Sequence, residues 1–245
     1  LEPGPCIAAR TMRGSASAAY ILPSIALLAA LLISPVLYAV WFSLHRVEYG
    51  AATDFVVLAN YVLLLDDPQL APMLGRTAVF TVASVALAIA AALALACWID
   101  RLRGRLAFVV QLVAILPWII SAVVATLLFR WVFVHDSGLG FAAARALDLH
   151  PTQPLNTPGG AMTLLILVSA WKRIGYAVIV LLAGLKSIPG DLTEAARIDG
   201  AGPWQIFRLI TLPLLRGPMI LVTIVLTLSN LNTVETPLVL TGGGP

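Results

Sequence analysis

Five long apolar segments dominate this sequence and decide its fold class. They cover approximately residues 19–44, 75–99, 107–134, 161–185 and 213–232. About 20 mostly apolar residues suffice for a helix that crosses a bilayer, and each segment reaches that length. Lipid offers no hydrogen bonds to the backbone, so a segment that crosses it must be helical. The sequence therefore predicts an all-α, polytopic membrane protein with five spans.

The composition also indicates a protein that lies in a lipid bilayer. Of the 245 residues, 60% are hydrophobic and 11% are charged, whereas a soluble domain carries about 25% charged residues. The net charge of +3 does not indicate a nucleic-acid surface, because no basic cluster is interleaved with aromatic residues. Cys6, Cys97 and the three histidines are scattered, so we expect no metal site.

The basic residues predict the orientation of the spans. If the N-terminus lies inside, the inner segments hold Arg10, Arg13, Arg101, Arg103, Arg105, Lys186, Arg197, Arg208 and Arg216. The outer loops, at about 46–74 and 135–160, hold only Arg46 and Arg145. Cytoplasmic loops carry an excess of basic residues. We therefore expect a cytoplasmic N-terminus.

The same boundaries suggest a domain organisation. Residues 1–18 form a cytoplasmic tail, 19–74 a first span with its outer loop, and 75–245 a transmembrane domain with a cytoplasmic segment at 187–213. A secretory signal peptide is the alternative for the first span. The run from Tyr20 to Leu44 is too long for one, and no small-residue cleavage site follows it.

The cytoplasmic segment 187–213 begins with the pattern of a short helix. Pro189 and Gly190 interrupt the fourth span, and Asp191 with Glu194 three residues later has the spacing of a capping box. Asp199 and Gly200 then end this helix, because glycine accepts the left-handed conformation of a C-terminal turn.

A second helix follows in the same segment. Pro203 suits its first turn, Trp204 and Phe207 lie on its apolar face, and Pro213 is expected to end it. From the pattern alone, an amphipathic connector resting on lipid headgroups is an equal alternative.

Three parts of this segment carry a resemblance. Glu194-Ala195-Ala196, Gly200 and Ile210-Thr211-Leu212-Pro213 resemble the EAA signature of binding-protein-dependent ABC permeases at its expected spacing. Further matches point to the maltose- and glycerol-phosphate-type sugar permeases, and within them to the maltose-type "F" subunits. These matches are Leu116-Pro117-Trp118, Trp171 with Gly175, Leu185 to Asp191, and Leu240-Thr241-Gly242-Gly243-Gly244-Pro245.

The resemblance implies a type I ABC importer transmembrane fold and a role for each matching residue. The chain would lie in the bacterial inner membrane, and the EAA segment at 187–213, whose first helix is expected from Leu192 to about Ile198, would dock as a coupling helix into a cleft of the ATPase. Glu194 would make the polar contact, Ala195 and Ala196 would allow close packing, and Asp199 with Gly200 would form the turn. The family has a further span after the Gly-Gly-Gly-Pro segment, so we expect a sixth span beyond Pro245.

The resemblance also implies a set of partners. The sequence contains no Gly-x-x-x-x-Gly-Lys-Ser/Thr loop, so this chain is expected to bind no cofactor and to catalyse no reaction. ATP and Mg would lie on a separate ATPase dimer. The other partners would be a second permease subunit and an extracytoplasmic solute-binding protein. Together they would import a sugar by alternating access.

Polar residues deep in the spans are candidates for the solute path. Lys172 and Arg173 lie roughly 15 Å into the fourth span, where each cation costs about 2.5–3.5 kcal/mol to insert. We expect them to face a hydrated cavity or to pair with an acid; snorkelling to an interface is the alternative. Trp171 and Tyr176 lie beside them and could stack on a sugar ring.

The fifth span adds Asn230, Asn232 and Glu235 near its outer end. They would line the outer part of the path, with Glu235 as a hypothetical partner of Lys172 or Arg173. Hydrogen bonding between helices is an equal alternative. The solute stays open among disaccharides, monosaccharides, polyols and glycerol-phosphate derivatives.

Other functional classes find less support in the sequence. A self-contained secondary transporter predicts internal repeats around a mid-membrane ion site, and the sequence shows no such duplication. An intramembrane enzyme would need a catalytic constellation within the spans, and none is present. An ABC permease for a non-sugar solute is the nearer alternative.

Overall fold

The computed structural model describes residues 14–48, 51–133, 138–146 and 154–242. The chain divides into two compact units, Leu1–Pro72 and Met73–Pro245. Most of the expected N-terminal tail, residues 1–13, lies outside the described residues, as do the last three residues of the Leu240–Pro245 segment.

The first unit contains a lipid-type helix and a small hairpin. Helix α1 spans Gly14–Ser43, and the apolar window within Ile21–Ser43 has a mean hydropathy of 2.3 and no buried residue. A helix that is hydrophobic all round and lacks protein neighbours is suited to lipid. A β-hairpin follows, which the sequence analysis did not anticipate. Strands β1 (His45–Glu48) and β2 (Ala51–Phe55) pair antiparallel, and helix α2 covers Ala59–Leu65.

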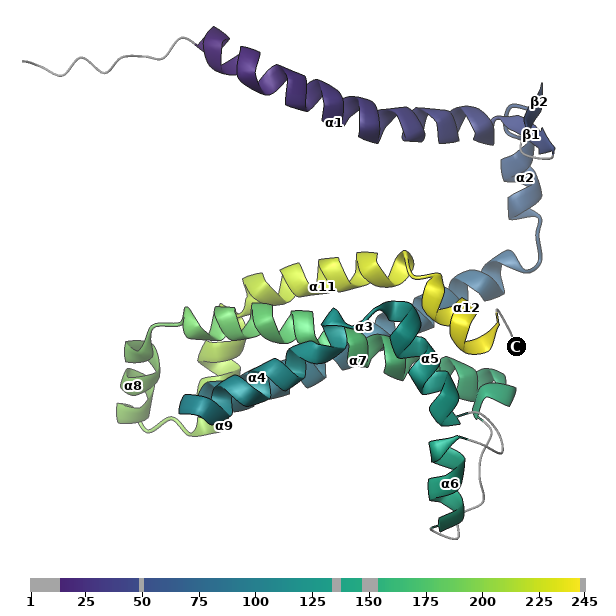
Figure 1. Cartoon of the computed structure of the whole chain (residues 1–245). Coiled ribbons are helices and arrows are strands. Elements are labelled where there is room, and N and C mark those ends of the chain that lie inside the picture. The colour runs from purple at the N-terminus through teal and green to yellow at the C-terminus, as the bar shows by residue number, and fades with distance from the viewer. Residues whose placement is uncertain (1–13, 49–50, 134–137, 147–153, 243–245) are drawn as a thin grey trace, which may run out of the picture. The chain divides into compact units, whose positions relative to one another are not determined.

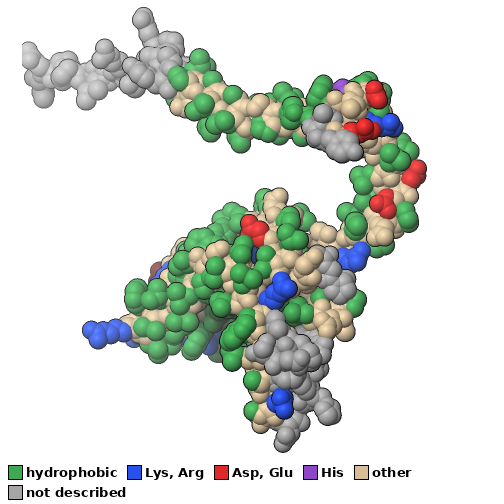
Figure 2. Space-filling model, turned by 45° about the vertical axis from the view of Figure 1, so that its right-hand side comes forward, with side chains coloured by type: hydrophobic (Ala, Val, Ile, Leu, Met, Phe, Trp, Pro, Cys, Tyr) green, Lys and Arg blue, Asp and Glu red, His purple; other side chains and the backbone are tan. Residues whose placement is uncertain are grey.

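The second unit is helical throughout its described part (Figure 1). Its elements are α3 (Leu70–Arg101, which begins in the first unit), α4 (Gly104–Ile119), α5 (Ala122–Phe133), α6 (Leu139–Ala146), the 3₁₀ turn η1 (Pro154–Asn156), α7 (Pro158–Lys186), α8 (Gly190–Ile198), α9 (Pro203–Ile206), the π turn η2 (Phe207–Thr211), α10 (Leu212–Leu214), α11 (Arg216–Leu231) and α12 (Glu235–Thr241). Helices α4 and α11 pack against α7. Figure 2 shows that hydrophobic side chains cover most of its visible helical surface.

Small residues allow the helices of this unit to approach closely. Ala88, Ala92 and Ala96 of α3 are fully buried in the core shared with α7 and α11, and their spacing of four places them on one face of that helix. At Gly175 of α7 an added Cβ would lie 2.9 Å from the Ala114 carbonyl oxygen of α4. Such contacts replace the hydrophobic effect, which does not act between helices in lipid.

Three helices are long and apolar enough to cross a membrane, and two bent pairs raise the number of candidate spans to five. The third apolar segment is not the single straight span that 107–134 predicted. It consists of α4 and α5, which meet at 96°. The helix continues through Pro117 and breaks at Ile120, whose extended backbone (ψ 138°) redirects the chain.

The connector before the last span also differs from the prediction. A helix starts at Pro203 as expected, but Pro213 does not end it. The chain stays helical through the π turn to Leu214, and α11 then starts at Arg216 after a bend of 64°. In a regular α-helix the ring of Pro213 would clash with the Leu209 carbonyl. The wider π turn accommodates the proline.

Candidate functional sites

The predicted coupling helix is α8, which lies at one end of the second unit, away from α5 and α12 (Figure 1). The helix begins one residue before the predicted cap, with Pro189 at the N-cap and no side-chain cap bond. The predicted capping box of Asp191 and Glu194 is therefore wrong. Asp191 lies in the first turn instead, where a negative charge interacts favourably with the helix dipole.

The turn after α8 forms as the sequence predicted. Gly200 has a φ of 84°, and the Ala201 N–H donates to the Ala196 carbonyl at 2.9 Å. Asp199 is the C-cap. The turn leaves Glu194 and Ala195 exposed and Ala196 half-buried, and Ile198 is 86% exposed. The surface of α8 is thus available to another polypeptide.

The two cations in α7 each bind backbone oxygens at the break of another helix. Arg173 is buried, and its Nη1 donates to the Ser169 carbonyl at 3.1 Å. Its Nη2 donates to the Ser229 carbonyl at 3.1 Å and to the Thr233 hydroxyl at 2.6 Å. These oxygens lie where α11 ends, so Arg173 satisfies acceptors that a helix C-terminus leaves free.

Lys172 performs the same task at the other break. Its Nζ donates to the carbonyl of Ile120, between α4 and α5. A helix C-terminus carries a partial negative charge, which a cation stabilises. Neither cation donates to a carboxylate in the described part of the chain. Backbone oxygens thus receive the hydrogen bonds of both cations, and Glu235 lies in the same pocket.

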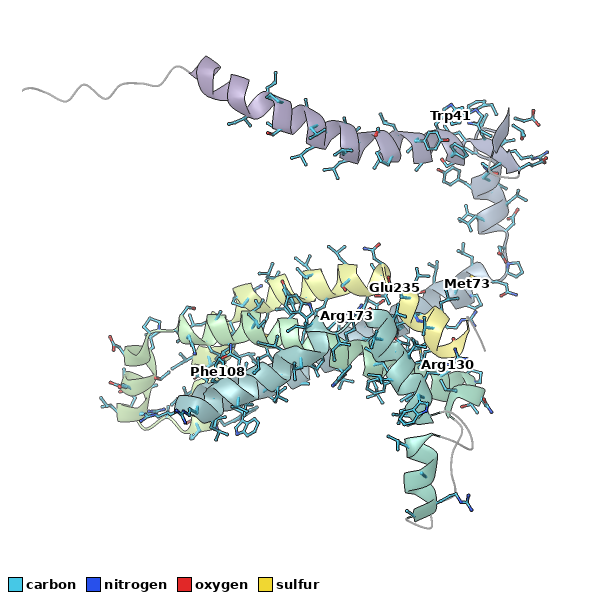
Figure 3. All side chains as sticks on the ribbon, in the orientation of Figure 1. Trp41, Met73, Phe108, Arg130, Arg173 and Glu235 are labelled. Carbon is cyan, nitrogen blue, oxygen red and sulfur yellow. The ribbon has the colours of Figure 1, made fainter. Side chains whose placement is uncertain are left out.

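A pocket of about 360 Å³ lies beside these two cations, between α4, α5, α7, α11 and α12. Figure 3 places Arg173 near Glu235, at the turn from α11 to α12. The pocket is lined by Trp118, Ala122, Lys172, Arg173, Tyr176, Val225, Leu226, Ser229, Thr233, Glu235 and Thr236. Trp118 and Tyr176 form an aromatic wall with ring centroids 5.9 Å apart. The other lining residues include the hydroxyl groups of Ser229 and Thr233 and the charged groups of Lys172 and Glu235.

The candidate path residues divide into two groups. Lys172, Arg173, Tyr176 and Glu235 line the pocket, whereas three others do not. Trp171 packs edge-on against Phe129, and Asn232 is exposed and donates to the Leu228 carbonyl at 2.9 Å. Asn230 is 2% exposed, and its amide has no hydrogen-bond partner among the described residues.

The structure adds pocket residues that the sequence analysis did not select. Trp118 comes from the end of α4, and Thr233 and Thr236 come from the turn into α12. This short helix packs on α5, and Arg130 of α5 donates to its Val239 carbonyl at 2.9 Å. The sequence signal for these residues was the Pro-Trp pair at 117–118 and the hydroxyl-rich stretch after Leu231.

Comparison with known proteins gives the family. Residues 84–245 match the profile of "Binding-protein-dependent transport system inner membrane component". The trehalose/maltose transport system permease protein MalF of Thermococcus litoralis is 34% identical over 227 residues, which are 92% of this chain and 76% of the relative. The sn-glycerol-3-phosphate transport system permease protein UgpA of Yersinia pseudotuberculosis is 33% identical over 92% of this chain and 76% of its own length. The sulfoquinovosyl glycerol transport system permease protein SmoG of Agrobacterium fabrum is 31% identical over 91% of this chain and 73% of its own length.

Solved structures show the same fold. A chain of a bacterial alginate ABC transporter, crystallised with a periplasmic protein that holds an alginate pentasaccharide, superposes with a TM-score of 0.76 at 22% identity. The match covers 94% of this chain and 80% of that one. The fold is therefore that of a type I ABC importer. This multi-pass inner-membrane chain belongs to the family of binding-protein-dependent transport system permeases.

Proposed function

We propose that this chain is one of two permease subunits of an ATP-driven importer for a carbohydrate or a sugar-like solute. A solute-binding protein outside the membrane delivers the solute, and an ATPase dimer in the cytoplasm supplies the energy. ATP and Mg bind to that ATPase, and this chain binds no cofactor. The N-terminus and α8 lie in the cytoplasm.

The exposed surface of α8 supports the coupling role. A short helix with exposed Glu194, Ala195 and Ile198, held between two turns, is suited to docking as a rigid element. Glu194 makes the polar contact with the ATPase, and the small side chain of Ala195 allows close approach. The matched relatives are named as permease proteins of transport systems. A permease protein within such a system agrees with an ATPase on a separate chain.

The pocket supports a carbohydrate as the solute. Aromatic side chains stack on the apolar faces of sugar rings, while hydroxyl and charged groups bind the sugar hydroxyls. Trp118 and Tyr176 provide the first kind of group, and Ser229, Thr233 and Glu235 the second. The single observation that carries the proposal is this combination of a pocket beside the middle of α7 with an exposed α8 beyond the end of that helix.

The coupling role is tested by Glu194→Ala in the complete transporter, reconstituted in proteoliposomes with its binding protein. We expect ATP-driven uptake to fall about tenfold or more, since losing a charged contact at an interface costs about 2 kcal/mol or more. Asp191→Asn is the matched control on the same helix, and it should transport at the wild-type rate. Equal uptake by the Glu194→Ala variant and the wild type would refute the assignment.

A further inference from the structure

A second cavity lies at the end of the unit that carries α8. It has a volume of about 430 Å³, and its walls come from the last turns of α3 and α7 and from the stretch between α8 and η2. The charged side chains in its walls are those of Asp100, Arg101 and Arg197. Neither guanidinium makes a hydrogen bond or ion pair within the described part of the chain. Two free guanidinium groups against one carboxylate leave a net positive site with donors that suit an anionic oxygen group.

An apolar groove continues from this cavity along α3. It has a volume of about 530 Å³ and shares Cys97, Arg101, Pro203 and Phe207 with the cavity. Its other lining residues are Ala90, Leu93, Ala94 and Trp204. The cavity, with its charged side chains, and the mainly apolar groove thus adjoin along these four residues.

The length and place of the groove fit one membrane leaflet. From Ala90 to Arg101 the groove follows about 16 Å of helix at 1.5 Å per residue. Half of a hydrocarbon core of about 30 Å measures about 15 Å. Trp204 is 67% exposed and lies against Phe207 where the groove meets the charged cavity. Tryptophan is enriched at that depth, at the boundary of hydrocarbon and headgroups.

We propose that this site binds one anionic phospholipid of the leaflet on the α8 side. Its phosphate lies on Arg101 and Arg197, and one acyl chain follows the groove along α3. The charge of the cavity selects the headgroup, because each basic residue near the membrane surface favours anionic lipid. Since Arg197 belongs to α8 and Arg101 to α3, a bound lipid would fix α8 relative to the membrane-embedded helices. The proposed function is needed only to identify this leaflet as the cytoplasmic one, and the lipid site itself is argued from the cavity and the groove.

The test uses the chain in nanodiscs that contain a phosphatidylglycerol with a photoactivatable acyl chain. Mass spectrometry then maps the crosslinked peptides. We expect crosslinks within Ala90–Cys97 and Pro203–Phe207, several-fold above those from phosphatidylcholine with the same reactive group. The double variant Arg101→Gln and Arg197→Gln should lower crosslinking by about 25-fold, a factor of about five for each cation.

Two further variants separate a built site from general effects. Arg103→Gln with Arg105→Gln removes the same charge at the same end of the unit but outside the cavity, and it should crosslink like the wild type. Arg101→Lys with Arg197→Lys keeps the charge and should retain most of the crosslinking, which shows that the double glutamine variant acts through charge and not through misfolding.

Several results would overturn the proposal. Equal crosslinking by phosphatidylglycerol and phosphatidylcholine would show that the groove only contacts the surrounding bilayer lipid and does not select a headgroup. An equal loss in the Arg103 and Arg105 control would show attraction by surface charge alone. Loss of crosslinking in excess inorganic phosphate would identify a free anion as the occupant. If neither lipid gave crosslinks in the groove, the groove would be covered by protein and not by lipid.

Discussion

At the scale of single residues, Arg173 and Lys172 show how a membrane protein keeps charges at depth. Each donates to backbone oxygens where another helix breaks. The sequence predicted their depth, yet not their partners, because a carbonyl at a helix break carries no mark in the sequence. Their hydrogen bonds go to backbone oxygens, while the pairing with Glu235 stays a hypothesis. The predicted cap at Asp191 was wrong because the helix starts two residues earlier, with Pro189 at the N-cap, which moves Asp191 into the first turn.

Replacing the Arg173 side chain tests this role at the same scale. Arg173→Met replaces the guanidinium side chain by a shorter, unbranched apolar one and removes all three hydrogen bonds, two of which leave α7 for Ser229 and Thr233. Hydrogen bonds between membrane helices average about 0.6 kcal/mol each, so we expect a loss of about 1 kcal/mol in unfolding free energy from these two. Thermal unfolding of the purified chain in detergent measures this loss. Lys186→Met, at the exposed end of α7, is the control, and equal destabilisation by both variants would contradict the assigned role.

At the scale of elements, hydropathy located the helices but not the breaks between them. The apolar run is continuous from α4 into α5, so nothing in its hydropathy marks the 96° change of direction at Ile120. Helix α12 was missed because its seven residues are too few for a span. The hairpin of β1 and β2 was missed because its strands are short and lie in a loop. In contrast, the ends of α7 and α8 were predicted from Pro189 and Gly200. These two residues are strong local signals, and each helix ends shortly before one of them.

The packing of α3 on α7 can be tested at this scale. Ala92 is fully buried in the shared core, so the larger side chain of Ala92→Leu must displace its neighbours there. Overpacking of this kind costs typically 1–3 kcal/mol. We expect lower thermal stability in detergent and less folded protein in the membrane fraction. Ala86→Leu, on the exposed face of the same helix, should leave both unchanged. A stable Ala92→Leu variant would show that the core around Ala92 has room for a larger side chain.

At the scale of the whole molecule, the described elements imply a polarity across the membrane. Helix α8 and the positive cavity lie at one end of the second unit, and α6 and α12 lie at the other (Figure 1). The sequence predicted opposite sides of the membrane for these two ends, because basic residues are distributed unequally between the loops. It could not predict the pocket, since the lining residues come from three parts of the chain, 118–122, 172–176 and 225–236, that lie far apart in sequence.

The polarity predicts the result of cysteine labelling in intact cells. In a chain with Cys6→Ser and Cys97→Ala, a membrane-impermeant maleimide should label Ala142→Cys of α6 from outside. Asp191→Cys of α8 should react only after the cells are opened. Both positions are exposed, so burial does not explain a missing signal. Labelling of both positions from the same side would contradict the topology.

The close contact of Gly184 has a mechanical consequence. An added Cβ at Gly184 would lie 2.8 Å from Pro218 and 2.9 Å from Leu215, so α7 and α11 meet there with no room between them. This contact can act as a pivot for α7. A force on α8, beyond the C-terminal end of α7, would then move the pocket at Arg173 on the other side of Gly184. Arg173 lies about 16 Å along the helix from Gly184. A rotation of about 10° around the pivot therefore moves one pocket wall by about 3 Å over that arm, roughly the size of a sugar hydroxyl.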